Sequence, residues 1–133
     1  MLIIKNSQIE SFIAEDDTQL VRVIREIIQE AFHEGVETYS EKKLDGMVRM
    51  GIEKARSRGF ERAEDIASFV SIMFEISPEF DMNEQIDAFL KDESYPPEMK
   101  LEQLLGRTQD DVWRAAEGTY DAKSWFRDPH PED

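Results

Sequence analysis

Residues 63–77 read AEDIASFVSIMFEIS, and this stretch decides the fold. Four apolar residues follow the i, i+3, i+4, i+7 spacing of an amphipathic helix: Ile66, Phe69, Val70 and Met73. Further apolar residues widen the stripe over most of the circumference: Ala67, Ile72, Phe74 and Ile76. A helix that is apolar nearly all round is a buried helix. We therefore predict that residues 63–77 form the central, buried helix of a small all-α bundle.

A narrow polar strip runs along the same helix and consists of Glu64, Ser68, Ser71 and Glu75. We expect it to be the exposed edge of an otherwise buried helix, and the alternative is that it lines a cleft. Ser77-Pro78 should end the helix, because a residue that precedes proline avoids the α region.

About five to seven helices are expected in all, arranged around the central one. Apolar spacing and end signals place the others at about 7–13, 17–32, 40–59, 83–91 and 97–106, with a further helix start at 108–111. Ser40 is the expected N-cap of the third helix, and Gly35 and Gly59 are the expected stops of the second and third helices. Gly51 and Ala55 make one face of the third helix thin, so that another helix can approach closely.

The chain has 133 residues, which predicts one domain with a core of its own. We assign residues 1–118 to a helical bundle domain and residues 119–133 to an acidic, aromatic tail. The tail is expected to be partly disordered, above all in its last six residues.

Several classes of chemistry find no support in the residues. There is no cysteine, and the two histidines, His33 and His130, have no second histidine at metal-ligand spacing. The acidic run at 81–87 fails as a calcium loop because Ile86 stands where glycine is needed. No GxSxG elbow, Walker loop or GxGxxG run is present. We expect no enzyme activity, no catalytic residue, no metal and no cofactor.

The net charge of −14 is unevenly distributed. Residues 40–62 carry a net charge of +3, whereas residues 1–39 carry −5 and residues 63–133 carry −12. Such a surface repels phosphate backbones, which argues against nucleic acid and favours a basic protein partner. The simpler reading is that acidity only keeps the protein soluble. No secretion signal or membrane span is visible, so we expect a cytoplasmic protein without membrane contact.

The C-terminal aromatic residues are the strongest candidates for a binding site outside the core. We predict a partner-binding set of Trp113, Tyr120, Trp125, Phe126, Asp121 and Asp128. Aromatic residues are favoured interface anchors, and acidic neighbours would steer a basic surface toward them. The alternative is that the aromatic residues cap the end of the bundle. We favour capping for Trp113 and the interface for Trp125 and Phe126.

Three segments together resemble a known group of proteins: MVRMGIEKA at 47–55, GF at 59–60 followed by AEDIASFV at 63–70, and MF at 73–74 with PEFD at 78–81. The pattern over roughly residues 1–105 resembles small uncharacterised helical proteins encoded beside bacterial type VI secretion spike, tip and effector genes. That group brings no assigned catalytic residues.

The resemblance implies a non-catalytic, chaperone-like adaptor in type VI secretion effector loading. Its protein partner would be a basic effector, a toxin or a spike component, and a homo-oligomer is left open. The alternative is an acidic immunity protein that neutralises a cognate toxin by covering its active site.

Overall fold

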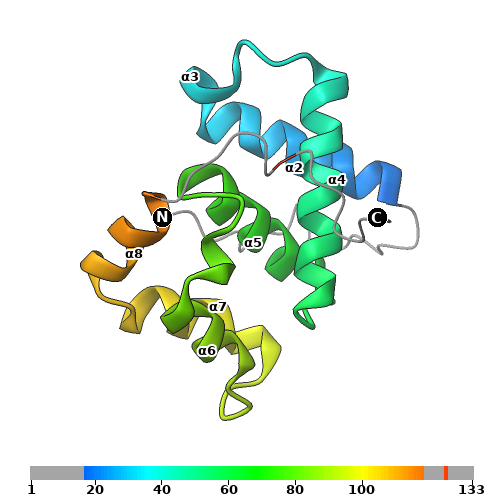
Figure 1. The fold of residues 1–133 in the computed structure, drawn as a ribbon. Coiled ribbons are helices and arrows are strands. Elements are labelled where there is room, and N and C mark those ends of the chain that lie inside the picture. The colour runs from blue at the N-terminus through cyan, green and yellow to red at the C-terminus, as the bar shows by residue number, and fades with distance from the viewer. Residues whose placement is uncertain (1–16, 119–124, 126–133) are drawn as a thin grey trace, which may run out of the picture.

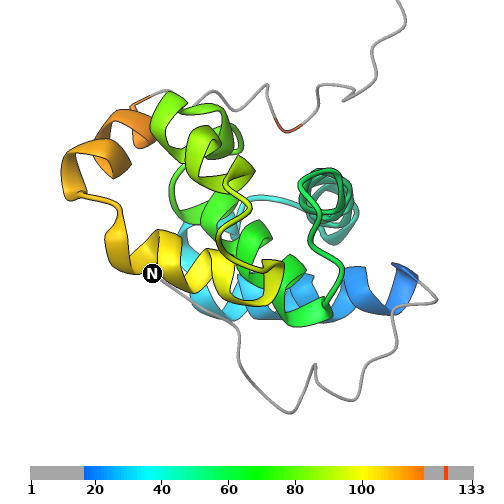
Figure 2. The same ribbon diagram turned by 90° about the horizontal axis from the view of Figure 1, so that it is seen from below.

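The computed structural model describes residues 17–118 and residue 125. In this part of the chain all regular elements are helical: α2 (Asp17–Ala31), α3 (His33–Val36), α4 (Glu41–Ser57), α5 (Ala63–Glu75), the 3₁₀ helix η1 (Phe80–Met82), α6 (Glu84–Lys91), α7 (Pro97–Arg107) and α8 (Asp110–Glu117). The predicted all-α fold class is confirmed. Helices α2, α3 and α4 lie on one side of α5, and α6, α7 and α8 lie on the other (Figures 1 and 2).

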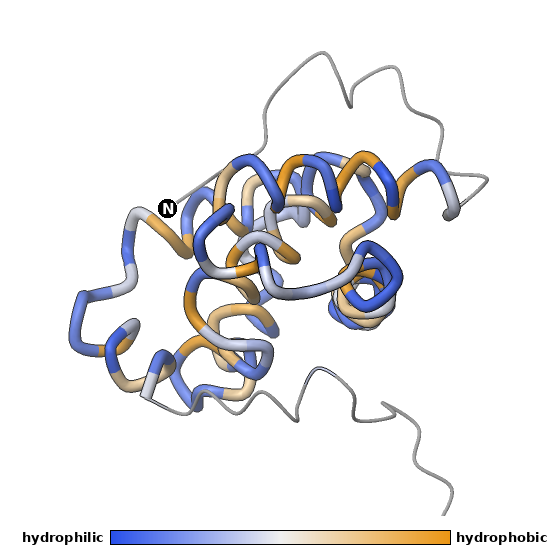
Figure 3. Tube along the Cα trace, turned by 90° about the horizontal axis from the view of Figure 1, so that it is seen from above, coloured by the Kyte–Doolittle hydropathy of each residue, from blue (hydrophilic) through white to orange (hydrophobic). Residues whose placement is uncertain are grey.

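Helix α5 is the buried centre, as predicted. Nine of its 13 residues, from Asp65 to Met73, are buried, and the helix packs against α2, α4 and α7. It ends at Glu75, and the N–H of Ile76 caps it by donating to the carbonyl of Ile72 at 2.8 Å. The covering helices show the complementary pattern. In Figure 3 apolar and polar positions recur along α2, as a helix with one buried face requires.

The polar strip of α5 corrects an expectation. Glu75 is exposed, but Ser68 and Ser71 are only 2% and 1% exposed. Each serine hydroxyl donates to the carbonyl four residues earlier, at 2.9 Å in both cases. This local bond satisfies the hydroxyl without water, so both serines can be buried at little cost. The strip is therefore not the exposed edge of the helix at these two positions.

A row of aromatic rings crosses the core from α4 to α8. Phe60, which follows α4, contacts Phe69 on α5 at 5.7 Å between ring centroids, and Phe69 contacts Phe80 on η1 at 5.0 Å. Phe80 in turn lies 6.4 Å from Trp113 on α8. All three phenylalanines are fully buried. The short helix η1, which the sequence did not indicate, places Phe80 in this row.

Two glycines were predicted to end helices, and only one of them does so. Gly59 has a φ of +93°, and it ends α4 as predicted. Gly35, the expected stop of the second helix, instead lies inside α3. Helix α2 ends earlier, because Phe32 leaves the helical region with φ −126° and ψ 36° and redirects the chain. The backbone turn at Phe32, and not Gly35, therefore ends α2.

A buried carboxylate ties the C-terminal end of α4 to the segment that follows α5. Asp81 is 1% exposed; its Oδ1 lies 2.7 Å from Lys54 Nζ in an ion pair, and its Oδ2 accepts from Arg58 Nε at 2.9 Å. Arg58 also reaches Asp87 at 2.6 Å, and Lys54 donates to the carbonyl of Pro78 at 2.6 Å. Lys54 and Arg58, two cations of the basic stretch 40–62, thus have internal acidic partners.

Helices α4 and α5 approach closely at Gly51, as the thin face of α4 predicted. A Cβ atom at this position would lie 2.9 Å from Val70 Cγ2 and 3.3 Å from Met73 Sδ. Both neighbours are fully buried and have little room to move. The other glycine inside α4, Gly46, is exposed, and a Cβ there would meet nothing within 4 Å. None of the described helices is both long and apolar enough to span a membrane.

The two glycines of α4 should respond to alanine with opposite signs. Gly46→Ala should raise the free energy of unfolding by about 0.5–1 kcal/mol, because alanine is the better helix former. Gly51→Ala gains the same propensity but overpacks the core, so it should lower that free energy by about 1–2 kcal/mol net. Chemical denaturation of the two variants measures both effects. An equal stabilisation by both substitutions would contradict the close contact between α4 and α5.

Candidate functional site

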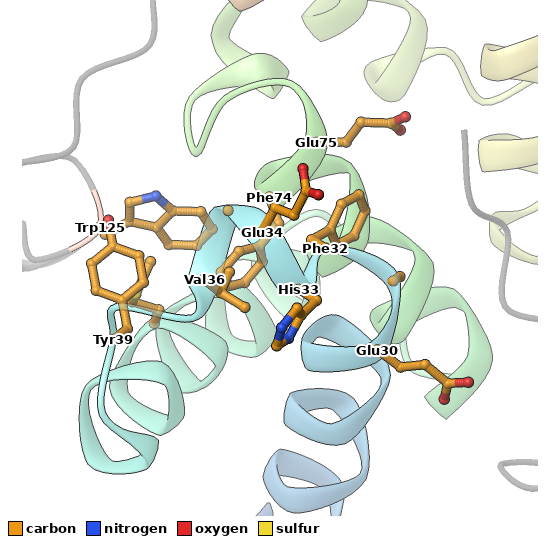
Figure 4. A pocket seen from close by; sticks show the side chains of 12 residues that line it. Glu30, Phe32, His33, Glu34, Val36, Tyr39, Phe74, Glu75 and Trp125 are labelled. Atoms are coloured by element: carbon orange, nitrogen blue, oxygen red, sulfur yellow. The ribbon is translucent and has the colours of Figure 1, made fainter.

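An open pocket of about 530 Å³ lies where α2 turns into α3, beside α4 and the last turn of α5. Four aromatic residues line it: Phe32, Tyr39, Phe74 and Trp125. Three glutamates also line it: Glu30, Glu34 and Glu75. In Figure 4 Trp125 and Tyr39 lie together at one side and Phe32 at the other, with the Glu34 carboxylate between them in that view. The carboxylates of Glu30 and Glu75 extend outward from the aromatic side chains.

The chain between α2 and α4 shapes the pocket. After the turn at Phe32, α3 runs for only four residues. The N–H of Glu37 then donates to the carbonyl of His33 at 3.0 Å, and the N–H of Tyr39 donates to the carbonyl of Val36 at 2.9 Å. Val36 is 5% exposed and anchors this corner to the core. Helix α4 then starts with Ser40 as its N-cap, as predicted, with the hydroxyl accepting from the N–H of Lys43 at 3.1 Å.

Two tilted rings in contact form one aromatic wall of the pocket. Phe74 is half-buried at the end of α5, and Trp125 packs on it with 4.4 Å between ring centroids and 36° between ring planes. Trp125 is 2% exposed. On the α4 side, the ammonium of Lys43 lies over the half-buried ring of Tyr39, 5.1 Å from the ring centroid. This is a cation–π contact, which shows that a cation is favourably placed against an aromatic face beside this pocket.

The electrostatic character of the pocket is acidic. Glu30 and Glu34 are exposed, and neither forms an ion pair with any residue that the structure describes. The one histidine of the lining, His33, lies 3.6 Å from the carboxylate of Glu37. Carboxylates without internal counter-ions at the mouth of an aromatic pocket favour a positively charged occupant.

The structure describes two members of the predicted partner-binding set, Trp113 and Trp125, and places them at different sites. Trp113 is 7% exposed and packs on Phe80, which agrees with the capping role favoured for it. Trp125 is 2% exposed and packs on Phe74, as the capping alternative described, and it also lines the pocket, so the interface role favoured for it stays a prediction. The remaining members of the set, Tyr120, Asp121, Phe126 and Asp128, lie outside the described residues.

Sequence reasoning missed most of the pocket. Phe32, Tyr39 and Phe74 come from three places in the chain, and Phe74 counted as part of the apolar stripe of the central helix. One signal was available, because Phe32 is a large aromatic residue at the very end of the predicted second helix, 17–32. The carboxylates of Glu30 and Glu34 were not distinguishable from the other acidic residues of a chain with 30 of them.

One buried carboxyl lies away from the pocket, in the first turn of α5. Asp65 is 8% exposed, and its Oδ2 has no hydrogen-bond donor among the described residues, although Arg62 Nε is 3.6 Å away. Burial raises the pKa of Asp65, Arg62 opposes the shift, and the nearby charge of Glu98 adds to it. No group of three or more potential ligands that could hold a metal ion occurs within residues 17–118 and 125.

Comparison of the chain with known protein families, with curated proteins and with solved structures finds no match.

Trp125 should contribute to the stability of the bundle. Trp125→Ala removes a buried ring but leaves a site that opens onto the pocket. We therefore expect the free energy of unfolding to fall by about 3 kcal/mol, the low end of the range for buried aromatic truncations. Met82→Ala is the control, because Met82 is 64% exposed and should change that free energy by less than about 0.5 kcal/mol. Equal stabilities of the two variants in denaturant melts would show that Trp125 does not pack on Phe74.

The raised pKa of Asp65 predicts a particular dependence of stability on pH. A carboxyl whose pKa is higher in the folded state binds more protons there, so stability falls as pH rises from the ordinary aspartate pKa through the raised one. Asp65→Asn should remove this loss and raise the free energy of unfolding at neutral pH.

Asp92 provides the opposite case for the same measurement. The N–H of Ser94 donates to its carboxylate at 2.9 Å and lowers its pKa. Asp92→Asn should therefore reduce stability at neutral pH, with the difference disappearing in acid. Denaturation of both variants at a series of pH values tests the pair, and a loss of stability in Asp65→Asn at neutral pH would contradict the role of burial.

Proposed function

We propose that this protein is a non-catalytic adaptor that binds a basic segment of a protein partner in the acidic, aromatic pocket beside α3. The observation that carries the proposal is the pocket itself, with its wall of Phe74 and Trp125 in ring contact and the carboxylates of Glu30 and Glu34 at its mouth.

The pocket has the properties that protein recognition requires. Its volume of about 530 Å³ falls in the range of ligand sites. Aromatic side chains provide large contact areas with little loss of conformational entropy and often dominate binding energy. The net charge of −14 attracts a basic partner over long distances and raises the association rate.

The resemblance to proteins encoded beside type VI secretion genes supports a finer proposal. In that setting the partner is an effector or a spike component, and the adaptor assists effector loading through contact alone. The high acidity suits a second candidate, an immunity protein that covers the active site of a basic toxin. Gene order distinguishes the two, because an immunity gene directly follows its toxin gene, whereas an adaptor gene lies beside a spike or tip gene.

Affinity capture with matched charge variants tests the proposal. The full chain, the variant Glu30→Gln/Glu34→Gln/Glu75→Gln and the control Glu84→Gln/Glu93→Gln/Glu117→Gln are used to capture proteins from a lysate of the source organism. Each variant removes three negative charges, and all three control residues are exposed and outside the pocket. We expect a basic protein that the wild type and the control retain and that the pocket variant loses.

Two results would contradict the proposal. Equal loss of the captured protein in both variants would mean that overall charge, and not the pocket, determines binding. Retention by both variants would place the interface elsewhere. Raising the salt concentration should slow the association of a genuine partner, since screening weakens the attraction between opposite charges.

A further inference from the structure

We infer that the pocket receives an arginine side chain of the partner, with its guanidinium held between the aromatic wall and the Glu34 carboxylate. This inference rests on the proposed function and specifies the chemistry of the contact.

The first step concerns the flat aromatic surfaces. The guanidinium group is planar and is less strongly hydrated than an ammonium, so it stacks on aromatic faces at a lower desolvation cost. The face of Tyr39 already contacts Lys43. The half-buried rings of Phe32 and Phe74 are the surfaces available to a ligand, and Trp125, which is 2% exposed, packs on Phe74 and holds its ring in place. Elsewhere in the same fold Arg107 lies 5.5 Å from the ring centroid of Tyr95, so this chain uses the arginine–aromatic contact itself.

The second step concerns the carboxylates. Glu34 lies between the aromatic residues in Figure 4 and forms no ion pair with a described residue. A guanidinium presents several N–H donors in one plane, so it can donate twice to one carboxylate while its face remains stacked. A lysine ammonium can satisfy Glu34, but it presents no flat surface to the aromatic wall.

The third step concerns the aliphatic stem of the side chain. Val36 and Met47 also line the pocket and are 5% and 1% exposed. They provide an apolar floor for the methylene groups of an arginine, which pack on apolar surface while the charged head stays near the carboxylates. A short acidic side chain or an uncharged polar one would neither pack on this apolar floor nor pair with the carboxylates of the pocket.

Blocked short peptides that differ in one side chain test the inference. The three peptides carry arginine, citrulline or lysine at the same central position between glycines. Citrulline has almost the shape of arginine but no charge. Each is titrated into the isotope-labelled full chain, and amide and indole chemical shifts are followed by NMR at peptide concentrations up to about 10 mM, because one side chain gives millimolar affinity at best.

The arginine peptide should shift the signals of residues 30–39, 74–75 and the Trp125 indole. Citrulline should bind about tenfold more weakly, and lysine about threefold more weakly, as expected from the loss of about one charge-assisted bond and of stacking. Glu34→Gln should weaken arginine binding about tenfold, the size of one such bond, while Glu84→Gln, an exposed site outside the pocket, should leave it unchanged.

Each other outcome overturns the inference. Equal binding of arginine and citrulline would exclude a charge-dependent site, and equal binding of arginine and lysine would reduce it to a site for any cation. Shifts outside the pocket, or none, would remove the arginine contact altogether. A concentration-dependent change of oligomeric state abolished by Glu34→Gln would identify a second copy of the chain as the occupant. The affinity capture tests the adaptor function separately from this inference. If the pocket variant alone loses the captured protein, the adaptor function stands even when the arginine contact is excluded. If the pocket variant shows no selective loss, the adaptor function itself is rejected.

Discussion

A helix that is apolar around nearly its whole circumference must be covered on every side, and this requirement on α5 organises the rest of the protein. Burying its side chains supplies the main stabilising term, and the two serines on its polar strip avoid a penalty by bonding to the preceding turn. Helices α2, α4 and α7 cover most of α5, and Gly51 allows α4 to lie against it. The cover ends at Phe74, where Trp125 completes it and where the pocket opens.

The distribution of charge follows from the same architecture. The stretch from 40 to 62 is the basic part of the sequence, yet Lys54 and Arg58 direct their charges inward to the buried Asp81. A buried carboxylate needs such partners, because its desolvation is otherwise too costly. Positive charges used in this way do not offset the acidic residues on the outside. The surface near the C-terminal end of α4 is therefore less positive than the local composition of 40–62 suggests.

How far the sequence predicts this structure depends on the range of the interactions involved. The apolar stripe at 63–77, the Ser40 cap and the Gly59 stop are local signals, and each appears where it was expected. The burial of Ser68 and Ser71 and the turn at Phe32 depend on backbone geometry that residue types do not reveal. The candidate site was the least predictable, because Glu34, Phe74 and Trp125 are far apart in the chain and only tertiary packing brings them to one pocket.

Trp125 links the fold and the candidate site in one side chain. Its burial against Phe74 covers the end of α5, and the same ring forms a wall of the pocket. A ligand that binds only when this wall is in place also stabilises the docked position of Trp125, by an amount set by its affinity and concentration. A change that loosens Trp125 lowers the affinity of such a ligand in proportion to the fraction of molecules in which the ring stays docked. The proposed recognition therefore depends on the packing of Trp125 against Phe74, which also covers the end of α5.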